Sequence, residues 1–292
     1  MWYFFISLLA VGLFNPGVVP SELDKSNPPE NIYSGPQRDF STQSVGVEIT
    51  ASSTLVTDVL SGRELYAKEP DLVVPIASIS KLMTALVFLE TNPDWNKVVK
   101  LLPVDEVYRA KYVYRGEEFT VQQIFWTMLI GSDNNAAMAL VRSTGLSVDQ
   151  FVERMNQKAK DLGFSKTSFS DPTGLSPQNV SSARELTRLA TLAWNEPEII
   201  KPSTWADFIL NDIKQNIKRK VINTNKLLGS FLDIEAGKTG FIDEAGYDLV
   251  ARISENSGHK ILVVTLGSAT DDDRFQDTKV LAWWVYANYL WP

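Results

Sequence analysis

Residues 75–89 read Pro75-Ile-Ala-Ser78-Ile-Ser-Lys81 and continue into the apolar run Leu82-Met-Thr-Ala-Leu-Val-Phe-Leu89. Ser78 and Lys81 are three positions apart, which on a helix puts both side chains on one face, close enough to touch. A hydroxyl beside an amine can be a nucleophile beside its base, but a lysine accepts a proton only when it is neutral. A free lysine, with a pKa of about 10.4, is neutral in about one copy in a few thousand at pH 7. The apolar run predicts a helix buried deeply enough to lower that pKa by desolvation.

Composition narrows what this pair can be, since Ser-x-x-Lys also occurs by chance, usually as a helix cap with a solvated lysine. The 292 residues, 44% of them hydrophobic, can bury a large core and suit one large domain or two lobes with a shared interface. A net charge of −7 without any basic run argues against a nucleic-acid partner. The lack of cysteine excludes thiol catalysis, thiolate metal sites and disulfides.

The chain contains one histidine, His259, which lies in Glu255-Asn-Ser-Gly-His259-Lys between two strand-like runs. This pattern predicts a hairpin turn, where a member of a Ser-His-Asp triad is improbable. A histidine-rich metal site is excluded. If the protein is a hydrolase, its base is a lysine or a carboxylate, and we expect neither a metal nor an organic cofactor.

The N-terminal region predicts export. Residues 1–14 are apolar and are followed by Asn15-Pro16-Gly17, which is short of the roughly twenty residues that a membrane-spanning helix needs. We therefore interpret residues 1–19 as a signal peptide or an uncleaved N-terminal anchor, and both place the body outside the cytoplasm. Residues 20–43, rich in proline and polar residues, predict an extended linker.

Residues 44–292 form the predicted folded body, in which strands, then helices, then strands follow one another. This order favours an α+β fold with two lobes, an antiparallel sheet flanked by helices and an all-helical insertion. The sheet lobe takes about 44–76 and 221–292, and the helical lobe about 77–220. Strands are expected at 45–50, 55–60, 231–234, 247–253 and 261–266, and helices at 121–130, 135–143, 147–163, 182–194 and 273–290.

Two further motifs lie at the ends of predicted elements. Ser132-Asp133-Asn134 interrupts two helices, where side chains can point into a cleft. Lys238-Thr239-Gly240 interrupts a strand, and glycine within a strand often marks close approach by a ligand or another backbone. Each motif alone is common. The order Ser-x-x-Lys, Ser-x-Asn, Lys-Thr-Gly is one that chance seldom produces.

With these three motifs the chain resembles the penicillin-recognising serine acyltransferases, the superfamily of D,D-peptidases and serine β-lactamases. Within it, the chain is most similar to the low-molecular-mass penicillin-binding proteins of the D-alanyl-D-alanine carboxypeptidase and endopeptidase family. The resemblance runs from about Ser44 to Trp284 and includes Leu129–Ala137, Asp171–Leu175, Asn179–Arg184 and Asn223–Leu228. It implies a β-lactamase/transpeptidase-like fold, peptidoglycan stem peptides as substrate, and covalent inhibition by β-lactam antibiotics.

The resemblance also implies catalytic roles. Ser78 would attack the carbonyl of a terminal D-Ala-D-Ala bond and form an acyl-enzyme, with Lys81 as its base. Ser132 would relay a proton to the leaving amine. Lys238 would lie close enough to Lys81 to help keep it neutral.

The implied binding residues surround these groups. Asn134 would hydrogen-bond the substrate amide, and Thr239 and Gly240 with Lys238 would meet the substrate carboxylate or the peptide stem. The backbone N–H groups of Ser78 and Phe241 would form the oxyanion hole. Arg274, just inside the last predicted helix, would help to bind the terminal carboxylate.

Alternative functions remain open at this level. A class A β-lactamase would need a glutamate about three dozen residues after Ser-Asp-Asn, but the window 166–176 contains only Asp171, which is better interpreted as a loop-shaping residue. Without such a glutamate, we expect the acyl-enzyme formed with penicillin to be hydrolysed slowly. A serine esterase, or a non-catalytic domain that binds peptidoglycan or β-lactam, would keep the same motifs.

Two further features bear on which kind of family member this chain resembles. Asp248 stands within a predicted central strand, where a carboxylate is costly unless it faces solvent or has a basic partner. The chain ends about fifty residues after Lys238, which resembles the compact, endopeptidase-like members more than those with an extra C-terminal domain. Membrane contact is expected only through the N-terminal segment.

Overall fold

The computed structural model describes residues 33–292, and residues 34–292 form one compact unit. The predicted signal peptide or anchor and most of the predicted linker lie outside the described residues. Among the residues that are described, no helix has both the length and the apolar character needed to cross a membrane.

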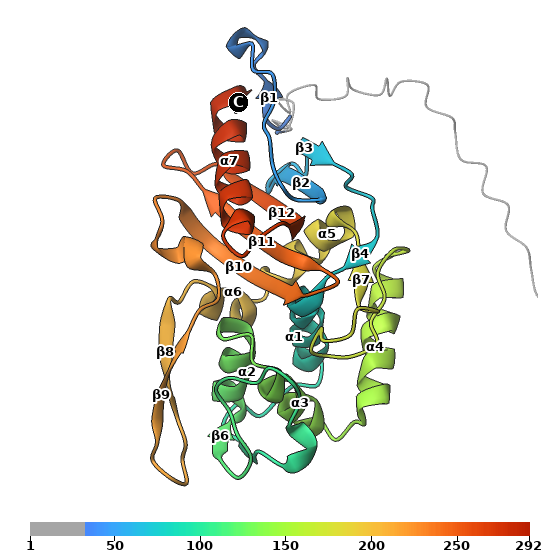
Figure 1. The fold of residues 1–292 in the computed structure, drawn as a ribbon, viewed down its shortest axis with the longest axis vertical. Helices are drawn as coiled ribbons and strands as arrows, with labels where there is room; N and C mark the ends of the chain where they lie inside the picture. Colours follow the sequence, from blue (N-terminus) through green and yellow to red (C-terminus); the bar gives the residue numbers. More distant parts are fainter. Residues whose placement is uncertain (1–32) are drawn as a thin grey trace, which may run out of the picture. The chain divides into compact units, whose positions relative to one another are not determined.

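The unit is built on a five-stranded antiparallel sheet to which both ends of the chain contribute (Figure 1). Strand β2 pairs with β12, so an early hairpin and a late meander form one sheet. The strand order is β10-β11-β12-β2-β3, with bounds β2 (Ser53–Asp58), β3 (Glu64–Lys68), β10 (Asp233–Ile242), β11 (Gly246–Ser254) and β12 (Lys260–Ser268).

The central strand β12 is buried on both faces because helices cover both. Successive side chains of a strand point to opposite faces. Leu262, Val264 and Leu266 accordingly enter the larger core, shared with α1 (Lys81–Leu89) and α5 (Ala183–Ala193). Ile261 and Val263 enter a second core, under α7 (Asp273–Asn288). The predicted sheet lobe is therefore a three-layer arrangement of helix, sheet and helix.

The helical lobe surrounds α1, of which residues 81–88 are all buried. Capping boxes begin two of its helices, at Thr120 and Ser147, where each hydroxyl accepts the N–H of the residue three positions on. The Asp133 carboxylate caps helix α3 (Asn134–Ser143) by accepting the N–H of Ala136, also three positions on. The remaining helices are α2 (Val121–Ile130), α4 (Val148–Asp161) and α6 (Pro197–Ser203).

Two predictions about strands are wrong. Residues 45–50 form no strand, because the N–H groups of Thr50 and Ala51 bond to the Asp277 carboxylate of α7 instead of to a neighbouring strand. Conversely, the region expected to be all-helical contains the hairpin of β8 (Asp207–Asn211) and β9 (Lys218–Ile222). Only one side chain on each strand of this hairpin is buried, so the apolar periodicity that reveals a strand is missing.

The predicted linker also needs correction at its C-terminal end. Residues 37–38 form β1 (Gln37–Arg38), which pairs with β13 (Tyr289–Leu290) at the end of the chain. The Arg38 guanidinium lies 4.3 Å from the centre of a Trp284 ring, a cation–π contact that secures this segment. Smaller elements complete the fold: β4 (Val74–Pro75) with β7 (Val180–Ser181), β5 (Val98–Lys100) with β6 (Glu118–Thr120), and the 3-10 turns Phe40–Thr42, Ala77–Ser80, Pro103–Asp105 and Lys226–Gly229.

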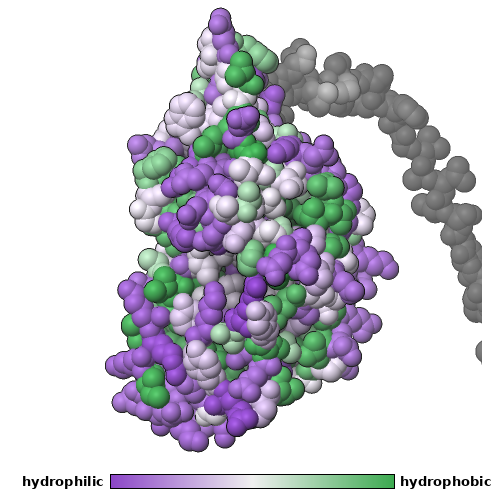
Figure 2. All heavy atoms as spheres, viewed as in Figure 1, coloured by the Kyte–Doolittle hydropathy of each residue, from purple (hydrophilic) through white to green (hydrophobic). Residues whose placement is uncertain are grey.

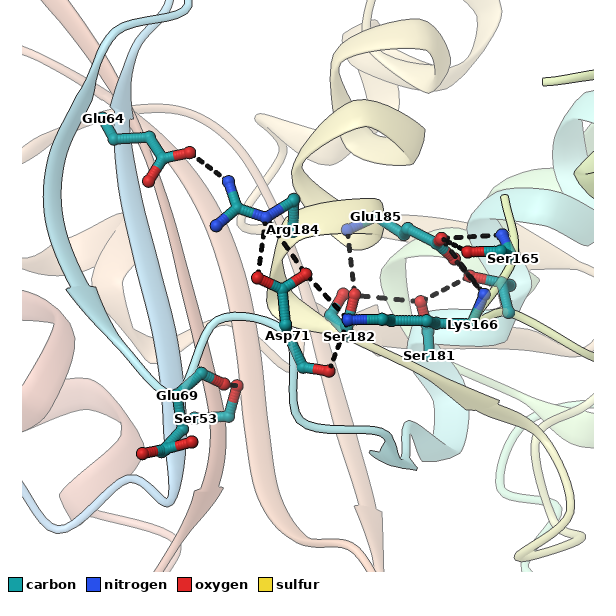
Figure 3. A network of polar contacts seen from close by, with 11 residues as sticks. Ser53, Glu64, Glu69, Asp71, Ser165, Lys166, Ser181, Ser182, Arg184 and Glu185 are labelled. Atoms are coloured by element: carbon teal, nitrogen blue, oxygen red, sulfur yellow. Dashed lines mark hydrogen bonds and ion pairs between the residues drawn. The ribbon is translucent and has the colours of Figure 1, made fainter. Parts of the chain in front are cut away.

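A polar network ties the start of α5 to the sheet (Figure 3). Arg184 contacts Glu64 of β3 and also the Asp71 carboxylate, which a second cation, Lys166, reaches at 2.9 Å. The sequence suggests a capping box at Ser182, but the Glu185 side chain accepts the backbone N–H groups at 165 and 166 instead. The network fixes both ends of the loop 165–182, which passes under the candidate site.

The surface is mixed. On the face drawn in Figure 2, apolar side chains are scattered among polar ones rather than gathered into a continuous band.

Candidate active site

Ser78 lies in a 3-10 turn, Ala77–Ser80, that runs directly into α1. In such a turn the side chains at i and i+3 are aligned, so Lys81 stands directly beside Ser78. The preceding Ala77 has φ 42°, a left-handed conformation that non-glycine residues rarely adopt. Gly174 packs against this backbone so closely that an added Cβ would lie 2.0 Å from the Ala77 carbonyl oxygen. Ser78 therefore sits on a strained turn that a neighbouring loop holds in place.

The surroundings of Lys81 suit a neutral amine. Lys81 Nζ lies 2.9 Å from Ser78 Oγ, 2.7 Å from Asn134 Oδ1 and 2.6 Å from the Thr173 carbonyl oxygen. The last two atoms can only accept hydrogen bonds, and a neutral amine has two N–H groups to give them. The lone pair then remains for the Ser78 hydroxyl. The Asn134 amide is oriented for this role because its Nδ2 donates to the Tyr108 carbonyl oxygen at 2.8 Å.

Burial lowers the pKa of Lys81 from 10.5 to about 7. The charges of Asp171 and Asp133 oppose this shift, and that of Lys111 adds to it. Lys238 also stays a candidate for keeping Lys81 neutral, because the charge of Lys81 lowers the pKa of Lys238 and such repulsion acts on both lysines. At neutral pH about half of the protein holds Lys81 as a free base.

Ser132 stands at the break between α2 and α3 with φ 55°, again in the left-handed region. The turn is held by Asp133, whose carboxylate accepts the backbone N–H groups of Lys111 and Tyr112 at 2.7 Å and caps α3. Ser132 Oγ accepts a hydrogen bond of 2.8 Å from Lys238 Nζ. The second and third motifs thus meet through their side chains.

Lys238 is buried within β10, and its Nζ also donates to the Thr239 carbonyl oxygen at 2.9 Å. Burial holds the pKa of Lys238 well below its usual value, and the charges of Lys81 and Arg274 lower it further. Each of the two serines thus contacts a buried lysine, Ser78 with Lys81 and Ser132 with Lys238.

A cleft opens above these groups. Seven of the predicted site residues line it, whereas Lys81 and Lys238 lie beneath its floor. The seven are Ser78, Ser132, Asn134, Thr239, Gly240, Phe241 and Arg274. All three motifs therefore converge on one cavity.

Arg274, at the start of α7, reaches this cavity from behind β10. Its Nη1 donates to the Gly240 carbonyl oxygen at 2.9 Å, and its Nη2 pairs with Asp271. Like the other lining residues, it can contact a ligand. A guanidinium at the end of a cleft is suited to a carboxylate.

Comparison with known proteins identifies the family of this chain. It is 37% identical to the D-alanyl-D-alanine endopeptidase of Pseudomonas aeruginosa over 222 residues, which are 74% of this chain and 71% of that protein. It is 31% identical to D-alanyl-D-alanine carboxypeptidase DacF of Bacillus subtilis over 242 residues, 79% of this chain and 61% of that one. Penicillin-binding protein D2 from Listeria monocytogenes, solved with cefotaxime bound, has a TM-score of 0.74 and 30% identity, covering 83% of this chain and 100% of that one. The D-alanyl-D-alanine carboxypeptidase family model (peptidase S11) matches residues 39–270.

The chain belongs to this family. Membership in the D-alanyl-D-alanine carboxypeptidase family confirms the predicted two-lobed fold and the predicted activity: the protein is a serine-type D-Ala-D-Ala peptidase of peptidoglycan. The roles of individual residues in this carboxypeptidase family member follow from the geometry above and are taken up as proposals below.

The cleft of this D-Ala-D-Ala peptidase also contains residues that were not predicted. Leu175 and Thr224 lie in stretches that carry the family resemblance, so a signal for them was present, and Thr224 accepts a 2.6 Å hydrogen bond from Thr239. Arg109 and Lys111 lie in a segment without regular periodicity or motif. No local signal marks these two cations, because only the folded chain brings them to the cleft.

The structure favours the loop-shaping interpretation of Asp171. Its Oδ1 accepts the backbone N–H of Gly174 at 2.8 Å, and its Oδ2 accepts that of Ser176 at 2.8 Å. The carboxylate is therefore engaged in forming the loop. His259, as predicted, lies in the turn between β11 and β12, where its ring stacks on Trp291 at 5.1 Å.

Asp248 departs from both alternatives that the sequence suggested, because it neither faces solvent nor forms an ion pair among the described residues. It is fully buried in β11 opposite Gly240, and its Oδ1 accepts the Gly267 N–H at 2.9 Å. Burial raises the pKa of Asp248 well above its usual value, opposed by the Gly267 hydrogen bond and the Arg274 charge. The surroundings of this carboxyl therefore disfavour its charged form.

Proposed function

We propose that Ser78 is the nucleophile of this peptidase and that Lys81, in its neutral form, is the base. The observation that carries the proposal is the set of three contacts around Lys81 Nζ, which leaves its lone pair directed at the Ser78 hydroxyl. No histidine or metal is needed for this step, because burial alone brings the amine to a useful pKa.

In the first step the Ser78 hydroxyl proton moves to Lys81 Nζ while Oγ bonds to the carbonyl carbon of the penultimate D-alanine. The charge that develops on the carbonyl oxygen is stabilised by the backbone N–H groups of Ser78 and Phe241. The C–N bond then breaks, and the leaving amine takes its proton through the Ser132 hydroxyl, which Lys238 contacts. Water later attacks the ester: its oxygen bonds to the acyl carbon, the bond from that carbon to Ser78 Oγ breaks, and a water proton passes through Lys81 to Ser78 Oγ.

The leaving group ends in a carboxylate, for which the cleft supplies partners. Thr239 and Arg274 line one end of it, and Lys238 lies directly beneath. Asn134 has one amide N–H left after its bond to the Tyr108 carbonyl, and this group can donate to the backbone carbonyl of the acyl part. The substrate is thereby gripped on both sides of the bond that breaks.

Slow deacylation should make penicillin an inhibitor rather than a substrate. The only carboxylate in the loop beneath the site, Asp171, has both oxygens occupied by loop N–H groups. It is poorly placed to direct water onto an acyl-enzyme. Long-lived acylation by β-lactams is the expected result.

Among the two activities of the family, we favour the endopeptidase. The chain is 37% identical to the endopeptidase from Pseudomonas aeruginosa but 31% identical to the Bacillus carboxypeptidase. In a cross-linked peptide the leaving amine carries a further peptide chain, so a wider cleft is required. Incubation with purified cross-linked and uncross-linked muropeptides, followed by chromatography, distinguishes the two: faster loss of uncross-linked pentapeptide would contradict the endopeptidase assignment.

A peptidase of peptidoglycan has to reach the wall, so we propose that the protein is exported. The N-terminal apolar segment, as a cleaved signal or a retained anchor, would supply the route and the only membrane contact. N-terminal sequencing of the mature protein decides between the two.

An intact-mass time course with excess benzylpenicillin tests the proposed chemistry. A one-to-one adduct that persists for many minutes and is lost in Ser78→Ala supports it. Rapid turnover of penicillin with little adduct would indicate a β-lactamase, and neither adduct nor turnover would indicate a non-catalytic binding domain. Labelling that survives Ser78→Ala, with the fold retained, would reject Ser78 as the nucleophile.

A further inference from the structure

The cleft of this protein carries more positive charge than one terminal carboxylate requires. Its lining includes three cations, Arg109, Lys111 and Arg274, and no aspartate or glutamate. Among the described residues, neither Arg109 nor Lys111 forms an ion pair, although Asp243 and Glu244 act on the Arg109 charge from the turn after β10. The cleft is therefore suited to a substrate with more than one negative charge.

Arg109 occupies a defined place beside the cleft. Its guanidinium lies 5.2 Å from the ring centre of Phe241 and 5.2 Å from that of Tyr108. These cation–π contacts and a side-chain hydrogen bond to Tyr108, which raises the pKa of Arg109, fix the planar head. A guanidinium has five N–H groups, so others remain for an anion. Its backbone is in the left-handed region at φ 64°, an uncommon conformation that tends to occur at ligand sites.

Arg109 and Arg274 serve different parts of the cleft. The Phe241 ring stacks on Tyr247 with 4.3 Å between centres, and the Arg274 guanidinium lies on the Tyr247 side, 5.5 Å from that ring. The two arginines thus rest on different rings of one stacked pair. Arg109 is next in sequence to Tyr108, whose carbonyl orients Asn134, the proposed partner of the acyl part.

We propose that Arg109, with Lys111 beside it, forms an anion subsite that selects substrates carrying a free carboxylate on the acyl part, in addition to the terminal one. This inference rests on the proposed acylation of Ser78. It names the substrate class more closely: a stem peptide in which the residue near the penultimate D-alanine bears a carboxylate. Arg109 contacts neither the reacting bond nor its proton relay, so it determines specificity.

A matched pair of penicillins tests the subsite directly. Benzylpenicillin and α-carboxybenzylpenicillin share one nucleus and one ring carboxylate, and differ by a single carboxylate on the acyl side chain. The second-order rate constant of acylation is measured for both by intact mass, and their ratio is compared between the wild type and Arg109→Gln. The control is Arg115→Gln, which removes an exposed arginine of the same segment that does not line the cleft.

We expect Arg109→Gln to lower the ratio about two- to fivefold, the size expected of one exposed ion pair. Arg109→Lys should restore part of the ratio, Arg115→Gln should match the wild type, and added salt should shrink the difference, because exposed charges are screened. A ratio equal in Arg109→Gln, Arg115→Gln and wild type would overturn the inference, as would an equal loss of both acylation rates in Arg109→Gln. If the wild type is not acylated by benzylpenicillin at all, the proposed function itself fails.

Discussion

The rate of acylation should follow the deprotonation of Lys81. Burial lowers the pKa of this lysine from 10.5 to about 7. At pH 7 the neutral fraction therefore rises from about one in 3,000 to about one half, a gain of about 1,500-fold in competent enzyme. The same shift corresponds to about 5 kcal/mol in favour of the free base.

The assay is the second-order rate constant for benzylpenicillin acylation between pH 5 and 9. Below the pKa only the neutral fraction reacts, so the rate constant should rise about tenfold per pH unit and level off above a midpoint near 7. Lys111→Gln removes a charge that lowers this pKa, so its midpoint should move to higher pH. Lys81→Arg, which cannot deprotonate, should abolish acylation at every pH.

Two results would refute this reasoning. A profile without a midpoint between pH 5 and 9, in protein that remains folded throughout, would mean that proton transfer to Lys81 does not control the step. A midpoint that moves to lower pH in Lys111→Gln would mean that the charge acts on a different group.

Three further substitutions probe the scaffold. Gly174→Ala places a Cβ 2.0 Å from the Ala77 carbonyl oxygen, and the forced shift under Ser78 should slow acylation about 100-fold; an unchanged rate would contradict the packing described. The raised pKa of Asp248 means that its carboxyl contributes fully to the stability of the fold below its ordinary pKa of 3.8 and contributes less as pH rises. The melting temperature of Asp248→Asn, relative to that of the wild type, should therefore increase from pH 4 to pH 8. A difference that stays constant with pH would contradict a raised pKa at Asp248. Arg142→Ala leaves Asp105, 2% exposed, without its partner and should cost about 2 kcal/mol in urea unfolding, less than a fully buried pair because Arg142 is one third exposed; no loss would mean that Asp105 finds another donor.

Much of the fold was predictable because local and tertiary preferences agree there. The helix 121–130 has a capping box, an apolar face and a terminal glycine, and the structure gives it the same bounds. Strands β11 and β12 carry the apolar runs Leu249–Ala251 and Ile261–Val264, because helices cover both faces of the sheet. The hairpin β8–β9 was missed since its side chains are mostly exposed, and residues 45–50 were assigned to a strand because their alternation gives no hint of the Asp277 carboxylate.

The residues of the candidate site were likewise predictable only where a local sequence signal marks them. Its motif residues carry chemistry in short, recognisable spacing, so the sequence predicts them and the structure brings them to one cleft. Arg109 and Lys111 reach that cleft only through tertiary contacts. The effect of the Lys111 charge on the pKa of Lys81 was not predicted for the same reason, because no motif marks the segment 105–113.

The backbone strain of the protein is concentrated where local preference fails. Among the described residues, seven non-glycine positions have positive φ, and two of them are asparagines, which tolerate it. Three of the other five, Ala77, Arg109 and Ser132, lie at the cleft. Each is held by contacts from elsewhere in the chain: Gly174 against Ala77, the Phe241 ring against Arg109, and Asp133 with Lys238 at Ser132. Such strain persists only where the surroundings overdetermine it, which is why the spacing of motifs could indicate the chemistry but not the geometry that performs it.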